Sequence, residues 1–251
     1  MIHAGRRWIL SLALLVPLPA RAQADDAREL MKRVLDSVPK VPFAAKLRLT
    51  TPEGVRELEL SHKLVGGARA SYLEVTAPET LKGMRFLFLE HLDKPPQQYI
   101  KIPASKRHVL VTEEASKQPF LASAFYVADL IEPELDASTY RFAGEQTVIN
   151  RPCKLVESVP KNPDDAIYGK TINALDPSDL LVLKREFFDH KQRPLKVWEV
   201  RKVEKVDGHW TILDQTMTNV QERTTSRLEA VSVHFQVELP DSMFTPDYLL
   251  R

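Results

Sequence analysis

Cysteine and glycine are scarce in this sequence, and each shortage excludes a kind of site. The only cysteine among the 251 residues is Cys153, so no disulfide can form within one chain. Its place in the run INRPCKLVE, where it alternates with Leu155, predicts a buried and unreactive strand residue. The eight glycines form no P-loop, no G-x-G-x-x-G fingerprint and no G-x-S-x-G elbow. The sequence therefore indicates neither a nucleotide-binding loop nor a hydrolase nucleophile of that type.

An excess of charge of either sign is also missing. The 35 Lys and Arg residues balance 34 Asp and Glu residues, which gives a formal net charge of +1. Loss of residues 1–22 would remove Arg6, Arg7 and Arg21 and no acidic residue, leaving a charge of about −2. This balance gives no electrostatic reason to expect nucleic-acid binding.

Long hydrophobic runs are absent from the chain after its N-terminal segment. No stretch there approaches the roughly 18 apolar residues of a membrane-spanning helix. The N-terminus itself has the pattern of a secretory signal peptide over residues 1–22. Arg6 and Arg7 precede the apolar run WILSLALLVPLPA, which ends at the A-x-A segment Ala20-Arg21-Ala22. We expect cleavage after Ala22, or two residues later, and export of the mature chain. The alternative is an uncleaved anchor or an amphipathic start of the domain.

The rest of the chain contains a regular series of strands after one helix. Apolar residues at helical spacing predict a helix over residues 25–38, which Pro39 and Pro42 would end. Beyond it, alternating runs separated by turn sequences such as Asp207-Gly208 predict about ten or eleven short strands. No βαβ alternation, repeat or Gly/Ser linker is present. We therefore expect a single domain over residues 25–251, built on a barrel-like or strongly curved antiparallel sheet.

The run KGMRFLFLE at residues 82–90 breaks the alternation expected of a strand with one wet face. Met84, Phe86 and Phe88 share one face, and Leu87 and Leu89 share the other. Both faces must therefore be covered, either by ordinary core packing or, on one side, by a cavity. Residues 120–131 suit a short helix or an irregular apolar plug better than a strand, so they are candidates for part of this cover.

No catalytic or metal-binding pattern is evident in the sequence. The histidines are scattered, with no H-x-H or HExxH pair. The carboxylate pairs Glu113-Glu114 and Asp164-Asp165 lie in loop-like segments that offer little of the shielding acid–base chemistry requires. We expect no enzyme activity, no metal and no cofactor, although a catalytic triad can also assemble from positions far apart in a sequence.

Three motifs occur in an order that points to a known family. A KG-x-x-F strand at residues 82–86 precedes a Y-x-x-x-P-x-x-K-R segment at residues 99–107. Residues 119–130, PFLASAFYVADL, then correspond to a segment of the form S-F-x-G-S-D-F-x-Y-x-D-L. The matching residues are Phe120, Ser123, Phe125, Asp129 and Leu130. Ala122 and Ala124 stand where that form has Gly and Asp, which leaves the role of the Asp and the loop conformation open.

In these motifs, and from about Val41 to Leu250, the chain resembles the LolA-like outer-membrane lipoprotein-sorting family, in the branch associated with membrane exporters. The resemblance implies a mainly β (α+β) fold. Its sheet would be a curved, incompletely closed antiparallel barrel with an N-terminal helix, and short helices would cover the concave face. It also implies a monomeric, non-enzymatic periplasmic carrier in transient contact with membranes. Such a carrier would take lipid or lipid-modified protein from an inner-membrane exporter towards the outer membrane.

Two groups of site residues follow from this resemblance. Lys106 and Arg107 would contact lipid head groups or an acidic exporter surface at the cavity rim, although a solvated turn also explains them. A one-residue error in register would invert the list of residues that line the cavity. The expected lining residues are Met84, Phe86, Phe88, Phe120, Phe125, Tyr126, Leu181, Leu183 and Phe187.

Three other functions stay open on the sequence alone. The first is a sensor that reports a bound lipid or lipoprotein to a membrane-bound regulator, although such sensors usually carry a second, smaller domain for which this chain has no room. The second is a periplasmic hydrolase with an unrecognised triad. The third is a structural β-domain of an envelope complex.

Overall fold

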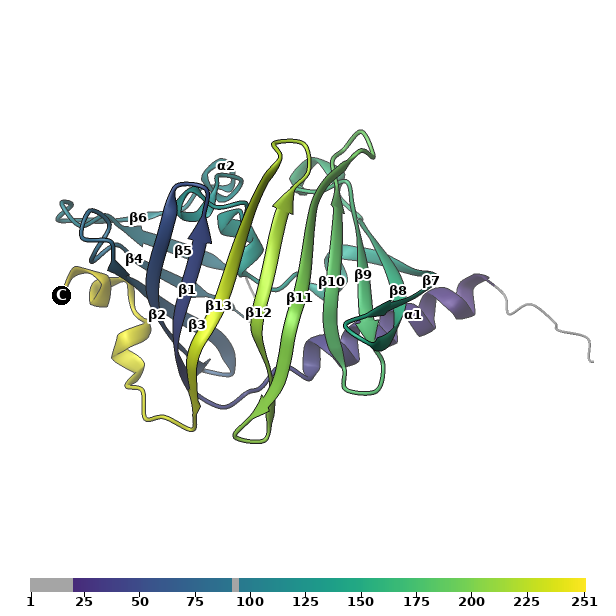
Figure 1. Cartoon of the computed structure of the whole chain (residues 1–251), viewed down its shortest axis with the longest axis horizontal. Coiled ribbons are helices and arrows are strands. Elements are labelled where there is room, and N and C mark those ends of the chain that lie inside the picture. The colour runs from purple at the N-terminus through teal and green to yellow at the C-terminus, as the bar shows by residue number, and fades with distance from the viewer. Residues whose placement is uncertain (1–19, 92–94) are drawn as a thin grey trace, which may run out of the picture.

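The computed structural model describes residues 20–91 and 95–251 (Figure 1). The basic and apolar parts of the predicted signal peptide, including Arg6 and Arg7, lie outside these residues. Within them, thirteen antiparallel strands form one sheet. The strands are β1 (Phe43–Thr51), β2 (Gly54–Val65), β3 (Ala68–Ala77), β4 (Arg85–Leu89), β5 (Gln97–Lys101), β6 (His108–Leu110), β7 (Ser138–Val148), β8 (Arg151–Pro160), β9 (Lys170–Asp176), β10 (Leu181–Phe188), β11 (Pro194–Val206), β12 (His209–Asn219) and β13 (Thr224–Phe235).

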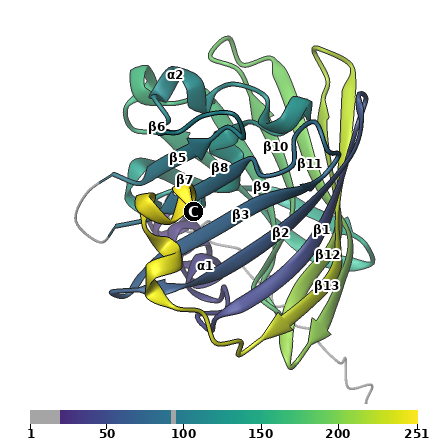
Figure 2. The same ribbon diagram turned by 90° about the vertical axis from the view of Figure 1, so that its left-hand side faces the viewer.

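The strand order explains why the sheet is open. It runs β6-β5-β4-β3-β2-β1-β13-β12-β11-β10-β9-β8-β7, so the first and last strands of the chain pair at its middle. The edges are β6 and β7, which are consecutive in the chain and are not paired with each other in this order. Figures 1 and 2 show a strongly bent sheet with the N-terminal helix on its concave side. The mainly β prediction with an N-terminal helix is confirmed, and the sheet does not close into a barrel.

The predicted number of strands, ten or eleven, is wrong because two stretches each contain an extra hairpin. Residues 97–110 divide into β5 and the three-residue β6. Residues 138–160 divide into β7 and β8 at Ile149 and Asn150, whose φ angles are 43° and 63°. Asn150 is common at positive φ but a branched residue such as Ile149 is not, so this turn lacks the sequence pattern of a typical two-residue hairpin turn. The Asp207-Gly208 turn between β11 and β12, with φ of 50° and 83°, is the kind that sequence does reveal.

Helix α1 (Ala20–Asp36) lies across one part of the concave face. Its side chains Ala27, Leu30, Met31 and Val34 are buried in a cluster with residues of β7, β8 and β9. Two polar contacts hold it in place. Arg28, at the middle of the helix, pairs with Asp136 at 2.5 Å, and near the C-terminal end Arg69 Nη2 donates to the Leu35 carbonyl at 2.9 Å.

The chain between the two edge strands covers another part of the concave face. It contains α2 (Glu113–Ser116) and the 3-10 helices η1 (Phe120–Ala122), η2 (Val127–Leu130) and η3 (Leu135–Ala137). We call residues 118–131 the cover segment. Its buried apolar side chains are Phe120, Ala124, Phe125 and Val127, which join a core cluster with Leu49, Leu58, Leu73, Val75, Phe86, Phe88, Phe187 and Met217.

The two apolar faces of β4 are covered by two different segments. Phe86 and Phe88 pack into the cluster of the cover segment, where the rings of Phe86 and Phe120 have centroids 4.9 Å apart. Leu87 belongs to a separate cluster with Phe244 and Leu249. These two residues lie in the C-terminal 3-10 helices η5 (Asp241–Phe244) and η6 (Pro246–Leu250). No residue of this strand lines the large cavity described below, and packing against these two segments explains its composition.

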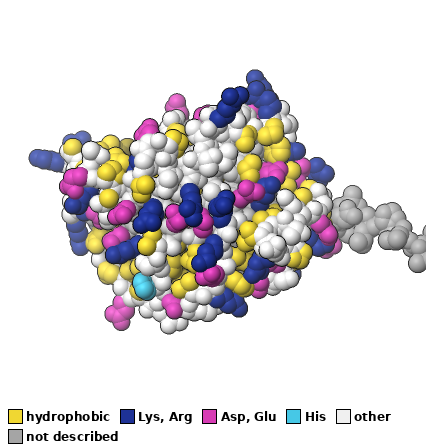
Figure 3. Space-filling view, in the orientation of Figure 1, with side chains coloured by type: hydrophobic (Ala, Val, Ile, Leu, Met, Phe, Trp, Pro, Cys, Tyr) yellow, Lys and Arg dark blue, Asp and Glu magenta, His cyan; other side chains and the backbone are white. Residues whose placement is uncertain are grey.

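The convex face of the central strands is charged. Figure 3 shows Lys and Arg side chains interspersed with Asp and Glu across this surface. Cross-strand pairs account for several of them, such as Lys46 with Glu59 and Arg227 with Asp214. The buried apolar side chains of these strands, such as Leu49, Leu58 and Met217, belong instead to the core cluster beneath the cover segment.

Candidate functional site

A cavity of about 1180 Å³ lies between the concave face of the sheet and the segments that cross it. This volume is slightly above the range of roughly 300–1,000 Å³ that is usual for small-molecule sites. The lining includes the exposed residues Glu134, Lys161 and Gly208, so the cavity reaches the surface.

Apolar side chains make up most of the cavity wall. One side is the concave face of the central strands, with Ala45 and Leu47 of β1, Leu60 of β2, Met217 of β12 and Ala230 of β13. The opposite side comes from α1 and the cover segment, which contribute Met31, Val34, Leu35, Leu130 and Ile131.

The structure divides the residues that the sequence assigned to the cavity. Phe125, Leu181 and Phe187 line it. Of the others, Phe86, Phe88 and Phe120 are buried in the core cluster, and Met84 packs against that cluster. Leu183 lies in a further buried cluster with Cys153. Tyr126 lies beside the buried Lys196, as described below. The ligand-binding role of all nine stays a prediction.

Several other residues of the cavity wall were not assigned to it from the sequence. The alternation of side chains along a strand would have identified some of them. Side chains two apart on a strand share a face, and Phe187 was expected to face inward. Arg185 on the same strand, together with its cross-strand neighbours Asn173 and Trp198, also lines the cavity. The wall from β1, β12 and β13 had no such signal, because nothing in the sequence says which strands lie opposite α1.

One ion pair lies in the cavity wall. Arg185 Nη2 is 2.9 Å from Glu132 Oε2, and the guanidinium carbon is 5.6 Å from the centroid of the Trp198 ring. Burial alone would raise the pKa of Glu132, but the facing guanidinium lowers it below its ordinary value. Arg185 Nε is buried and has no hydrogen-bond partner among the described residues.

A buried polar cluster fastens the cover segment to the sheet. Asp129 accepts hydrogen bonds from Lys196 Nζ at 3.0 Å, from the Tyr168 hydroxyl at 2.5 Å and from the backbone N–H of Tyr126 at 2.7 Å. The Lys196 ammonium also lies 2.8 Å from the centroid of the Tyr126 ring. Burial lowers the pKa of Lys196 to about 8 and raises that of Tyr168 well above its ordinary value.

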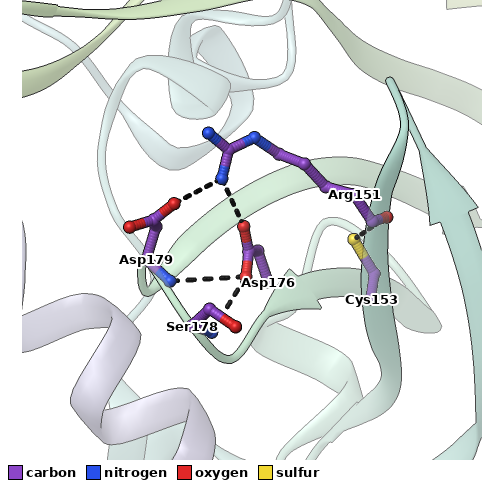
Figure 4. Close-up of polar contacts among 5 residues, drawn as sticks. All are labelled: Arg151, Cys153, Asp176, Ser178 and Asp179. Carbon is purple, nitrogen blue, oxygen red and sulfur yellow. Dashed lines mark hydrogen bonds and ion pairs between the residues drawn. The ribbon is translucent and has the colours of Figure 1, made fainter.

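A second polar cluster lies at the turn between β9 and β10, at another end of the cavity (Figure 4). Arg151 Nη1 is 2.7 Å from Asp176 and 2.5 Å from Asp179, and its guanidinium carbon is 4.6 Å from the Trp210 ring centroid. The backbone N–H of Ser178 donates to Asp176 at 2.9 Å. Nearby Cys153 is buried, and burial raises the pKa of its thiol, as expected of an unreactive residue.

Lys106 and Arg107 lie apart from the cavity. Both are exposed in the turn between β5 and β6, and neither lines the cavity. The same hairpin exposes three apolar side chains, Ile102, Val109 and Leu110. The hairpin thus presents cationic and apolar groups together at one edge of the sheet.

Two further kinds of site were sought in the described residues. No group of three or more His, Cys, Asp or Glu side chains there is placed to hold a metal ion. Among the helices of residues 20–91 and 95–251, none is long and apolar enough to span a bilayer.

Comparisons with known proteins bear on the fold. A family model described as an uncharacterized protein matches residues 67–251. No curated protein sequence matches the chain significantly. Among solved structures, a candidate outer membrane lipoprotein-sorting protein domain from Vibrio parahaemolyticus is similar at 22% identity and a TM-score of 0.83, covering 91% of this chain and 100% of that one.

Two other solved structures give the same result. A DUF1329 family protein from Desulfovibrio piger has a TM-score of 0.83 at 19% identity, with 90% of this chain and 99% of that one covered. A LolA superfamily protein from Nitrosomonas europaea has a TM-score of 0.64 at 16% identity, with 92% and 100% covered. At these identities the likeness shows the fold, and the LolA-like fold expected from the motifs is confirmed.

Proposed function

We propose that this chain is a periplasmic carrier of lipid or lipoprotein acyl chains. The premise is that the chain belongs to the family whose model matches residues 67–251, and that the chain itself has a LolA-like fold. In this proposal the mature chain is a single, monomeric, non-enzymatic domain. It receives its cargo from an inner-membrane exporter and passes it towards the outer membrane. The observation that carries the proposal is the apolar cavity of about 1180 Å³.

The energetics of an acyl chain explain why such a cavity suits a carrier. Burial of a methylene contributes about 0.8 kcal/mol, so a chain of about 16 carbons in water costs on the order of 10 kcal/mol. A soluble carrier must offset most of this cost, or the lipid stays in the bilayer. It must not greatly exceed it, or release becomes slow. The flexible apolar side chains of the wall, among them Met31, Met217 and several leucines, support this proposal because they can adapt to hydrocarbon.

Native mass spectrometry with organic extraction tests the proposal on protein purified from its own periplasm. We expect stoichiometric acyl-containing cargo, and a matched pair of variants locates it. Ala230→Trp places an indole in the cavity, whereas Val231→Trp enlarges the next side chain along β13, which is exposed. The first should reduce bound cargo about tenfold, the second should not. A bare polypeptide that also takes up no lipid from vesicles would contradict the proposal.

The hairpin of β5 and β6 is the part we propose for transient contact with membranes or the exporter. Lys106 and Arg107 are placed to meet anionic head groups, while Ile102, Val109 and Leu110 are exposed for contact with the interface. Alanine at both basic positions should slow uptake from anionic vesicles several-fold and leave the melting temperature unchanged, since both side chains are exposed. Equal uptake by the variant and the wild type would remove this role.

A further inference from the structure

Arg185 is unusual among the residues of the cavity wall. The described lining includes one lysine and one arginine, Lys161 and Arg185, and Lys161 is exposed to solvent. Arg185 lies within β10, between Asn173 on one neighbouring strand and Trp198 on the other, and its side chain is only 15% exposed. A charge placed in an apolar wall costs free energy unless a partner compensates it.

Glu132 is that partner, but it pairs with only part of the Arg185 guanidinium. It contacts one terminal nitrogen of the guanidinium, Nη2, and leaves the buried Nε without a partner among the described residues. Guanidinium groups bind carboxylates and phosphates most strongly through two parallel hydrogen bonds, which use the whole fork. The arrangement therefore has capacity for a better anionic partner than Glu132.

The two members of the pair also differ in how firmly they are held. Arg185 is part of a strand in the middle of a paired region. Glu132 lies in the irregular stretch between η2 and η3, and its side chain is 37% exposed. An incoming anion would therefore compete with Glu132 for the Arg185 guanidinium.

We propose that Arg185 anchors the acidic headgroup of an amphiphile, a carboxylate or a phosphate, whose acyl chain occupies the cavity. This rests on the carrier function proposed above and specifies its cargo. Glu132 is then the internal substitute for the headgroup when the cavity holds no cargo.

The other acidic residues of the wall do not oppose such a ligand strongly. Asp129 is paired with Lys196, and Asp179 is paired with Arg151. Glu134 and Asp165 are exposed, where solvent screens their charge. Arg185 and Glu132 thus remain as the facing charges of the wall, and Arg69 is close enough to lower the pKa of Glu132 further.

Four probes with the same chain and different headgroups test this proposal. Delipidated protein is titrated with palmitate, hexadecyl phosphate, hexadecanol and hexadecylamine, and binding is followed by the fluorescence of Trp198 and Trp210, both in the wall. We expect one or both anionic probes to bind roughly tenfold or more tightly than hexadecanol, and hexadecylamine to bind most weakly. Palmitate and hexadecyl phosphate distinguish a fatty acid from a phospholipid headgroup as the source of the anion.

Two variants with opposite expected effects exclude a trivial loss of structure. Arg185→Gln should reduce the affinity for the anionic probes roughly tenfold or more and leave that for hexadecanol unchanged. Glu132→Gln removes the competing carboxylate and should increase the affinity for the same probes. Lys184→Gln is the matched control, because Lys184 is the adjacent cation on β10, lies outside the cavity lining and pairs with Glu186 at 2.8 Å.

The outcomes separate this proposal from the carrier function. If none of the four probes binds, the carrier function itself fails. If all bind with equal affinity, or if the amine is preferred, the cavity holds hydrocarbon but Arg185 does not select an anion, and this inference is overturned.

Discussion

Asp129 and Lys196 form a buried contact that joins the cover segment to the sheet. Asp129 lies in η2 and Lys196 lies in β11, far apart in the sequence, and the Lys196 side chain is 0% exposed. The sequence marked Asp129 through its motif but gave it no partner. Because two charges this deeply buried are stable only as a pair, each fixes the place of the other.

Asp129→Ala should lower the free energy of unfolding by about 3–5 kcal/mol, because it leaves the Lys196 ammonium buried without a counterion. Urea denaturation measures this change. Glu113→Ala removes a partner of the exposed pair between Glu113 and Lys117 and should change stability by no more than about 0.5 kcal/mol. Equal effects of the two variants would show that the buried pair does not hold the cover segment.

The same pair predicts how stability depends on pH. Burial lowers the pKa of Lys196 to about 8, from an ordinary value of 10.5. Between these values the unfolded chain holds a proton that the folded chain has released, so the free energy of unfolding rises with pH. We expect a rise of about 1 kcal/mol per pH unit from pH 8 to about 9.5, measured by urea denaturation and absent in Lys196→Met. Parallel curves for the two proteins would contradict this assignment.

At the scale of whole elements, the C-terminal helices η5 and η6 explain the composition of β4. The side of the strand away from the cover segment is apolar because these helices pack on it, through Phe244 and Leu249. The sequence predicted that both faces needed a cover but not that the C-terminus supplies one. The alternation of apolar and polar residues along a strand shows how many of its faces are shielded from water. Which element covers each face depends on contacts between residues distant in the sequence.

Two adjacent leucines of η6 test this packing. Leu249 is 0% exposed and Leu250 is 45% exposed. Leu249→Ala should reduce the free energy of unfolding by about 2–5 kcal/mol through lost burial and the cavity left behind, whereas Leu250→Ala should change it by less than about 0.5 kcal/mol. Thermal or chemical denaturation of the two variants gives the comparison. A small loss for Leu249→Ala would mean that η6 is not part of the core.

The family motif itself shows where local patterns stop being informative. Ala122 occupies the position that has Gly in the motif, and it keeps a positive φ of 58°. The loop thus adopts a glycine-like conformation despite the side chain, because packing of Phe120 and Phe125 on either side fixes the path of the chain. The sequence left this conformation open, and the backbone at Ala122 lies in the region that glycine favours.

At the scale of the molecule, the sequence predicted the curved antiparallel sheet and its helix but only part of the cavity. Phe125, Leu181 and Phe187 were placed by motif and alternation, and they do line it. Most of the wall comes instead from β1, β12, β13 and α1, which meet because β1 pairs with β13 at the centre of the sheet. That pairing joins the two ends of the domain, and no local pattern encodes it.

The central claim is that hydrocarbon occupies the space enclosed by this sheet, α1 and the cover segment. Methyl NMR of the protein with a spin-labelled fatty acid tests it most directly, because the label broadens the signals of nearby methyl groups. We predict broadening at the cavity residues Leu47, Leu60 and Met217, with little effect at Leu87, which lies beneath the C-terminal helices. Binding that broadens only exposed residues such as Val109 and Leu110, and leaves the cavity methyls sharp, would contradict the account.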